Sequence, residues 1–186
     1  MVPEPRSAYA LQFFLLAAVV LAAAASLSYV LTETLVVSKL KPHQFSAAFI
    51  VSTGLLMAGS ACMFRAVESV RRERQRPFRR WLELALSMGT CFVGVQTYAL
   101  TCLIRQQPPE EVSTGAAAFV AVFAVLHGMH FVVALLFLCY VTIQALADRY
   151  DHEYFWGVTI CAWFWHALGI VWLAILVVML IARVYN

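Results

Sequence analysis

The chain has 186 residues, of which 63% are hydrophobic and only 12% carry a formal charge. Soluble domains are close to half apolar and about one quarter charged, so this composition excludes an ordinary soluble protein and indicates a membrane protein. The net charge of +3 arises mainly from one short basic connection, and it therefore does not indicate nucleic-acid binding.

Five apolar runs of at least twenty residues contain no Asp, Glu, Lys or Arg. They cover residues 8–32, 44–64, 84–104, 112–147 and 154–182. Each run is long enough to cross a bilayer, which takes about 20 helical residues, and none shows the alternation of a barrel strand. We therefore predict an all-α integral membrane protein with a single domain over residues 1–186. Its five transmembrane helices are expected at about residues 8–32, 44–64, 84–104, 116–147 and 154–182.

The first apolar run follows Arg6 and contains small residues at 22–26, features that cleaved signal peptides share. The run continues through residues 29–31 and is long enough to span the bilayer. We therefore expect a retained first helix.

A basic connection joins the second and third runs and fixes the predicted orientation. Its arginines are Arg65, Arg71, Arg72, Arg74, Arg76, Arg79 and Arg80. Because short connections rich in Lys and Arg stay in the cytoplasm, we expect this connection and the N-terminus there, with the C-terminus on the opposite side. The basic residues then divide nine against four between the two sides.

Small and polar residues recur along the second and third runs, where they favour close helix contacts. They are Ser52, Thr53, Gly54, Gly59, Ser60, Gly89, Gly94 and Gln96. The five cysteines also lie inside apolar runs without CxxC spacing, which is typical of small packing residues.

Three histidines, His127, His130 and His166, lie inside the last two runs. An imidazole in hydrocarbon is costly without a partner, so these positions indicate a buried surface that faces protein. His127 and His130 are three residues apart and are expected to share a helix face. We favour histidines that are hydrogen-bonded in helix packing. The alternative is a bis-histidine membrane cytochrome, in which His127 or His130 would ligate a haem together with His166.

Tryptophans cluster around the last histidine. Trp165, Gly169 and Trp172 follow a spacing of four and three residues on one helix face, with the glycine expected to make room between the two indoles. Trp163 lies beside them. The pattern predicts a close helix contact in the middle of the last span.

Taken in order, these motifs resemble the cytochrome c oxidase subunit III family in a short five-helix form. The family's His-Gly-x-His is matched at His127, Gly128 and His130, and its Gly-x-x-Phe-x-x-x-Gln at Gly89, Phe92 and Gln96. Its closing motif is matched by Trp163, Trp165, His166, Val171, Trp172 and Leu173. The resemblance covers nearly the whole chain and is strongest after Phe123.

The departures from the family pattern concern its acidic residues. Where the family usually carries carboxylates, this chain has Ala18, Ala99, Thr159 and Gly169. The chain therefore resembles a divergent branch, and the roles of those carboxylates do not carry over.

The resemblance implies a non-catalytic subunit of a haem-copper terminal oxidase in aerobic respiration, which stabilises the catalytic subunit and packs phospholipid. Haem and copper would belong to catalytic subunit I, with no cofactor in this chain. The expected partners are that subunit and other oxidase subunits, in a bacterial inner membrane. Trp172 is expected to contact the catalytic subunit. A related alternative is the subunit III-like accessory protein of a nitric oxide reductase.

Overall fold

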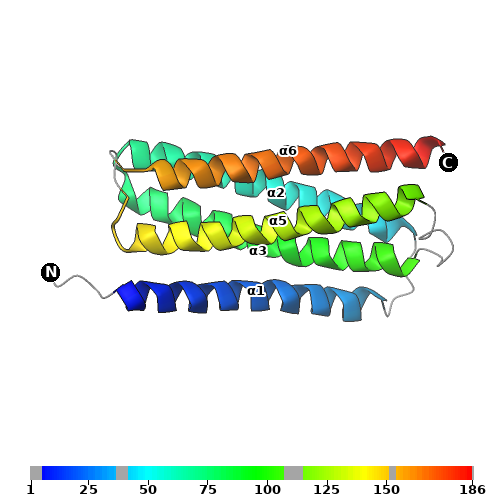
Figure 1. Cartoon of the computed structure of the whole chain (residues 1–186), viewed down its shortest axis with the longest axis horizontal. Coiled ribbons are helices and arrows are strands. Elements are labelled where there is room, and N and C mark those ends of the chain that lie inside the picture. Colours follow the sequence, from blue (N-terminus) through cyan, green and yellow to red (C-terminus); the bar gives the residue numbers. More distant parts are fainter. Residues whose placement is uncertain (1–5, 37–41, 107–114, 151–153, 186) are drawn as a thin grey trace.

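The computed structural model describes residues 6–36, 42–106, 115–150 and 154–185 (Figure 1). These residues form five helices and no strand. The helices are α1 (Arg6–Val36), α2 (Pro42–Arg71), α3 (Gln75–Gln106), α5 (Gly115–Leu146) and α6 (Trp156–Tyr185). Each is long and apolar enough to cross a membrane, which confirms the predicted all-α fold class.

The helices extend beyond the apolar runs that identify them. The clearest difference is at α3, which begins at Gln75 rather than at Leu84, and α2 likewise continues past Phe64 to Arg71. Each helix has 30 to 32 residues. At 1.5 Å per residue this is about 45 Å, the thickness of a bilayer including its headgroup layers. Charged residues can therefore remain helical outside the hydrocarbon, where hydropathy does not detect them.

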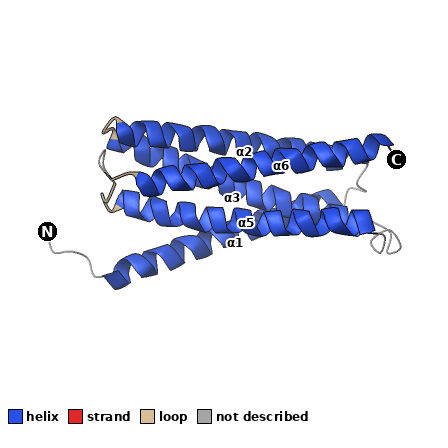
Figure 2. Cartoon of the chain, turned by 45° about the horizontal axis from the view of Figure 1, so that its top comes forward, coloured by secondary structure: helices blue, strands red, loops and turns tan. Residues whose placement is uncertain are grey.

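Four helices form a bundle and the fifth lies outside it. Contacts run from α2 to α3, from α3 to α5, from α5 to α6 and from α6 back to α2, which closes the bundle. Helix α1 packs on the outside against α3 and α5 (Figure 1). Figure 2 shows that α1 is inclined to the other helices. At its crossing with α3, a Cβ placed on Gly94 would lie 2.9 Å from the Ala24 carbonyl oxygen, so the glycine permits this close approach.

The connections gather at two ends of the bundle. The start of α1, the α2–α3 turn and the segment after α5 lie at one end, which we call the basic end; α6 ends at the other (Figure 1). Helices α2 and α5 end there, and each is followed by a residue with a left-handed backbone conformation. These residues are Glu73, with φ 56°, and Asp148, with φ 54°. Each follows the last turn of a helix, where a left-handed residue commonly stops it.

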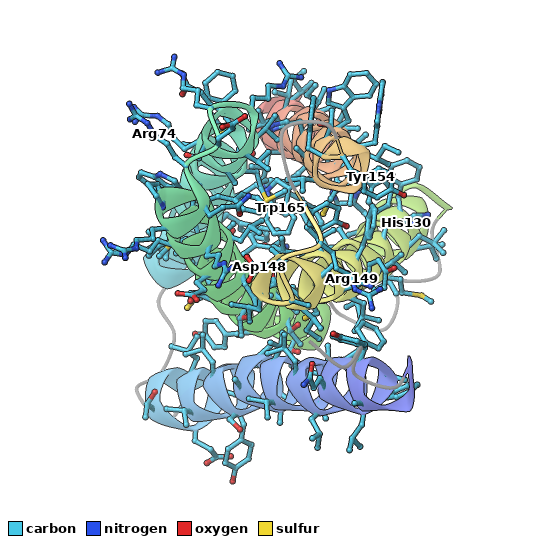
Figure 3. All side chains as sticks on the ribbon, turned by 90° about the vertical axis from the view of Figure 1, so that its left-hand side faces the viewer. Arg74, His130, Asp148, Arg149, Tyr154 and Trp165 are labelled. Atoms are coloured by element: carbon cyan, nitrogen blue, oxygen red, sulfur yellow. The ribbon has the colours of Figure 1, made fainter. Side chains whose placement is uncertain are left out.

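Several contacts between elements tie the basic end together. Arg79 forms an ion pair with Asp148, and the Gln75 side-chain amide donates a hydrogen bond to the Tyr150 carbonyl at 2.9 Å. The Arg71 guanidinium lies 5.1 Å from the centre of the Phe155 ring. Figure 3 looks onto this end and shows Arg74 pointing away from the bundle. The basic end is therefore joined by side chains from both of its connections.

Fully buried side chains concentrate in the middle of the bundle and towards the basic end. Those nearest the basic end are Met63, Val70, Phe78, Leu82, Leu138, Val141 and Val158, each with 0% exposure. Large aliphatic and aromatic side chains such as Phe14, Ile50 and Ile170 cover the outer surface and are more than 60% exposed. An apolar exterior of this kind fits a lipid environment.

Candidate functional site

The indole of Trp165 lies at the centre of the bundle interior. It projects from α6, is 0% exposed and lies in the middle of the helices in Figure 3. A Cβ placed on Gly89 of α3 would lie 2.7 Å from Trp165 Cη2, and one on Gly59 of α2 would lie 3.2 Å from Cζ2. The two glycines therefore form the space that receives the indole, which gives a physical reason for small residues on α2 and α3.

Trp172 lies two turns further along α6 and likewise contacts α2 and α3. It is 2% exposed, and its Nε1 donates to Thr53 Oγ1 of α2 at 3.3 Å. Its ring stacks on Phe49 with centroids 5.9 Å apart. Neighbouring helices of its own chain cover nearly all of this side chain, so Trp172 takes part in helix packing. The effect of Trp172→Ala on association with the catalytic subunit stays a prediction.

His127 of α5 completes an aromatic cluster with these indoles. Its ring is 6% exposed and lies parallel to Trp172, with centroids 6.1 Å apart and 7° between the planes. It meets Phe131 edge to face at 5.0 Å, and Phe131 meets Trp165 in the same manner at 5.8 Å. We call Phe92, His127, Phe131, Trp165 and Trp172 the aromatic cluster. It links α3, α5 and α6.

His130 does not share the environment of His127. Its ring is exposed, and its Nδ1 lies 2.7 Å from the Leu126 carbonyl oxygen of the preceding turn. Three helical residues fall about 60° short of a full turn, and this rotation separates a buried from an exposed position. The expected common buried face of the two histidines is therefore wrong within this chain.

The remaining predicted residues of α6 also divide between interior and surface. Trp163 is 67% exposed and points away from the bundle, whereas His166 is half-buried. Gly169 is buried, but a Cβ there would meet only Leu56 of α2, at 3.8 Å. A Cβ at Gly169 would therefore make only an ordinary contact with α2 and none with the two indoles, which corrects the expected role of this glycine.

A pocket of about 220 Å³ opens between α3 and α5 beside the aromatic cluster. Its lining residues are Phe92, Val93, Gln96, Thr97, Leu100, Ala124, Val125, His127, Gly128, Met129, Phe131, Val132 and Trp172. The predicted residues Gln96 and His127 are thus brought together from two helices. No pattern in the sequence indicated this pocket, because it depends on how α3 and α5 pack against each other.

A second hollow lies between α1 and α5 at the basic end. It is lined by Tyr9, Ala10, Phe13, Phe14, Tyr140, Ile143, Gln144 and Arg149. The guanidinium of Arg149 lies 4.4 Å from the centre of the Tyr9 ring. A cation at the edge of an apolar hollow is suited to an anionic headgroup with acyl chains.

Of the three histidines in the last two helices, only His127 lines the pocket between α3 and α5. Among the described residues, no group of three or more His, Cys, Asp and Glu side chains could hold a metal ion. His127 lines the pocket between α3 and α5, whereas His166 is not one of its lining residues. His127 and His166 therefore do not line this pocket together, and the pairing of His130 with His166 stays an alternative prediction.

The positions of the missing family carboxylates are mostly interior. Ala99 is 1% exposed, Thr159 is 5% exposed and Gly169 is buried, while Ala18 lies on the outer face of α1. An unpaired carboxylate at any of the three interior positions would carry a large desolvation cost. Their replacement leaves an interior that packs without ionised groups.

Together, the five spans and the aromatic cluster define an integral membrane protein whose interior is devoted to helix packing. The family described as cytochrome c oxidase subunit III matches residues 13–183 of this sequence. The match takes in most of the α1 span and the whole of the other four spans. The chain belongs to the cytochrome c oxidase subunit III family.

Individual relatives are distant. The chain is 25% identical over 126 residues to a "Probable cytochrome c oxidase subunit 3" of Nocardia farcinica, a match that covers 66% of this chain and 60% of the relative. It is 23% identical over 127 residues to cytochrome c oxidase subunit 3 of Cyprinus carpio, covering 67% of this chain and 46% of the relative. For the Spodoptera frugiperda protein, identity is 22% over 127 residues, with 67% and 82% covered. The matched part of the chain thus spans about half the length of the first relatives.

Proposed function

We propose that this chain is a non-catalytic accessory subunit of a haem-copper terminal oxidase in aerobic respiratory electron transport. The observation that carries the proposal is the family match over residues 13–183. In this role the chain stabilises catalytic subunit I, which holds the haem and copper, and contacts other subunits of the oxidase. Its own residues supply shape and contact surface.

The interior of the chain supports a structural role. The five apolar runs carry no carboxylate, and a proton path through a membrane normally needs one. Beside the aromatic cluster, the hydrogen bond from Trp172 Nε1 to Thr53 Oγ1 joins α6 to α2. A chain with this interior can hold a fixed surface against a neighbouring subunit.

His130 and Trp163 are the favoured candidates for contact with that neighbour. Both lie in membrane spans, and both are exposed on the surface of the chain. An imidazole that faces acyl chains is costly, so His130 is better placed against a polar group of another subunit. The two side chains lie on α5 and α6, which pack side by side.

Phospholipid is a further proposed partner. The hollow between α1 and α5 combines apolar walls with Arg149 near the helix ends. A lipid phosphate can pair with the guanidinium while its acyl chains follow the apolar wall. The pocket between α3 and α5, in contrast, has no charged lining residue and does not suit a lipid headgroup.

The proposed location is the bacterial inner membrane, with the basic end in the cytoplasm. The support is the rule that basic connections stay inside, together with the gathering of the N-terminal end of α1 and the α2–α3 turn at one end (Figure 1). Cysteine accessibility settles the orientation: a cysteine at Arg74 should react only with reagents that cross the membrane.

Affinity purification of the tagged chain from native membranes tests the proposal. We expect a haem-copper catalytic subunit of the oxidase type to co-purify. Recovery of a nitric oxide reductase in its place would favour the alternative accessory role, and recovery of no haem-copper chain would contradict both.

The same preparation tests the contact surface. His130→Leu should lower the yield of the catalytic subunit, whereas Val133→Leu on the same helix, where the side chain is also exposed, should leave it unchanged. Equal yields for both variants would show that His130 does not contact the partner.

A further inference from the structure

Two residues that line the pocket between α3 and α5 each carry a buried polar atom with no hydrogen-bond partner within the described residues. The two atoms are Oε1 of Gln96 and Nε2 of His127. Both residues line the same pocket, and the His127 side chain is only 6% exposed. Buried polar atoms are almost always hydrogen-bonded, so two in one pocket point to a ligand that bonds them.

The shape of the pocket limits what this ligand can be. Its volume of about 220 Å³ exceeds the about 150 Å³ of an engineered cavity that holds benzene, so one six-membered ring with small substituents fits. The rings of Phe92, His127, Phe131 and Trp172 supply flat walls. Aromatic walls of this kind favour a planar guest that can stack or meet them edge to face.

The pocket opens towards lipid and not towards water. Its rim includes Val125 and Met129, which are 42% and 61% exposed. Gln96 lies in the span Gln75–Cys102 and His127 in the span Val122–Leu146, so both polar atoms are within the membrane. A ligand must therefore arrive from the bilayer, and an apolar tail can remain between the rim residues.

The polar atoms decide the functional group of the ligand. A carboxamide oxygen such as Gln96 Oε1 only accepts, so the ligand must carry a hydrogen-bond donor. Imidazole Nε2 donates or accepts, depending on its tautomer. A ring hydroxyl satisfies both atoms, and no lining residue carries a charge that would call for an ionic group.

We propose that this pocket binds the hydroxylated ring of a membrane-dissolved quinol, with its apolar tail leaving through the rim. The ring lies against the aromatic cluster, and its hydroxyl groups bond to Gln96 Oε1 and His127 Nε2. The site belongs to this chain alone and does not depend on which catalytic subunit the chain accompanies. Binding is the whole of the proposal, since no redox group lines the pocket.

Photolabelling locates the ligand directly. The full-length chain, in the complex with which it purifies, is placed in nanodiscs of phosphatidylcholine and phosphatidylglycerol. The probe is a short-tailed benzoquinol with a diazirine on its tail, and the competitor is the same quinol without diazirine. We expect label on α3 near residues 92–100 or on α5 near residues 124–132, with saturation and full competition. Label confined to other helices or to other subunits would overturn the proposal.

A filling variant tests the pocket without touching its polar atoms. A Cβ at Gly128 meets no atom within 4 Å, so Gly128→Leu places its side chain in open space. We expect it to weaken the saturable labelling at least tenfold. Gly54→Leu is the matched control, because a Cβ at Gly54 also meets nothing within 4 Å and Gly54 does not line the pocket.

Polar variants test the assigned hydrogen bonds and preserve the shape. Gln96→Leu removes the acceptor and should weaken binding about 3- to 10-fold, the equivalent of one hydrogen bond. His127→Phe keeps a ring next to Trp172 and removes Nε2, with a similar loss expected. If Gly128→Leu lowers expression, these two variants still decide the question.

Three outcomes would contradict the quinol assignment. Unchanged labelling in both Gln96→Leu and His127→Phe would show that the two polar atoms do not bind the ring. Competition by added phosphatidylglycerol as strong as that by the quinol would assign the pocket to a lipid hydroxyl. Labelling of the isolated chain that disappears in the complex would assign the pocket to a side chain of the partner subunit.

Discussion

The two halves of the four-helix bundle differ in how completely they are packed. Towards the basic end, Val70, Phe78 and Leu82 are 0% exposed, and the Arg79–Asp148 ion pair joins the two connections. Towards the opposite end, Leu100 is only half-buried and the α3–α5 pocket interrupts the packing. The same helices therefore pack densely at one end and leave space at the other.

The uneven packing shows which part of a membrane bundle can contain a binding site. Lipid is as apolar as leucine, so helices associate through close packing and hydrogen bonds rather than through removal of apolar surface from water. In this chain those interactions are concentrated in the middle and at the basic end. The other end can then carry a pocket with two unpartnered polar atoms while the fold is held elsewhere.

Among the variants that test this difference in packing, the largest loss of stability is expected for Trp165→Ala in the middle of the bundle. Because the indole is fully buried between two glycines, its removal should lower the free energy of unfolding by about 3–5 kcal/mol. Reversible unfolding in mixed micelles measures this loss. Trp163→Ala, two residues away and 67% exposed, is the matched control and should change stability by about 0.5 kcal/mol at most. Equal losses would contradict the placement of the two indoles.

Two leucines on α3, one in each half of the bundle, allow the cost of losing a side chain to be compared between the halves. Leu82→Ala should cost about 2–5 kcal/mol, because its side chain is 0% exposed. Leu100→Ala enlarges an existing pocket that can relax or fill with lipid, so its cost should be clearly smaller. The same unfolding measurement applies to both. A Leu100→Ala cost equal to that of Leu82→Ala would show that the two halves are packed alike.

A smaller effect is expected for the hydrogen bond between α2 and α6. Thr53→Val keeps the side-chain shape but removes the acceptor of Trp172 Nε1, and it should cost about 1–2 kcal/mol. Thr97→Val serves as the control, since the exposed Thr97 hydroxyl donates to the Val93 carbonyl of its own helix at 2.8 Å. A shift in indole fluorescence reports the change at Trp172. If both variants behave alike, the bond at Thr53 is not formed.

The smallest effect is expected at the basic end. The Asp148 side chain is 71% exposed, so Asp148→Asn should cost about 1 kcal/mol or less, while retaining a residue type that tolerates the left-handed backbone. A double-mutant cycle with Arg79→Gln isolates the ion pair. The coupling should decrease with added salt. A salt-independent coupling would indicate that the pair is shielded from solvent.

The number and type of the helices could be predicted from the sequence, because unbroken apolar runs in lipid leave the backbone no alternative to helix. The helix ends could not, as α3 shows: Gln75, Arg76 and Arg79 are helical, yet hydropathy ignores them. Spacing identified Trp165 and Trp172 as one face of the last helix. It did not show that their neighbours on other helices would be Gly89 and Thr53, since helix pairing is a property of the whole bundle.

The histidines show more clearly what could not be predicted from the sequence. His127 and His130 differ by about 60° around the same helix, and sequence alone does not say where the edge of the buried face falls between them. The structure places that edge between the two residues, because Trp172 and Phe131 cover one ring and leave the other outside. The pocket was equally hidden. It depends on the separation of α3 and α5 beside Gly128, which no pattern in either helix encodes.

The position of α1 constrains the order in which the chain assembles. In the described part of the chain, α1 contacts α3 and α5 but not α2, its neighbour in sequence. Within the described part of the chain, α1 therefore has no docking site until α3 has entered the bilayer. It must wait in lipid, or against an insertion factor, while its successors are synthesised. Packing of α1 onto the next helix in the sequence is thus excluded, and pulling-force measurements on stalled nascent chains should record α1 docking only after α3 emerges.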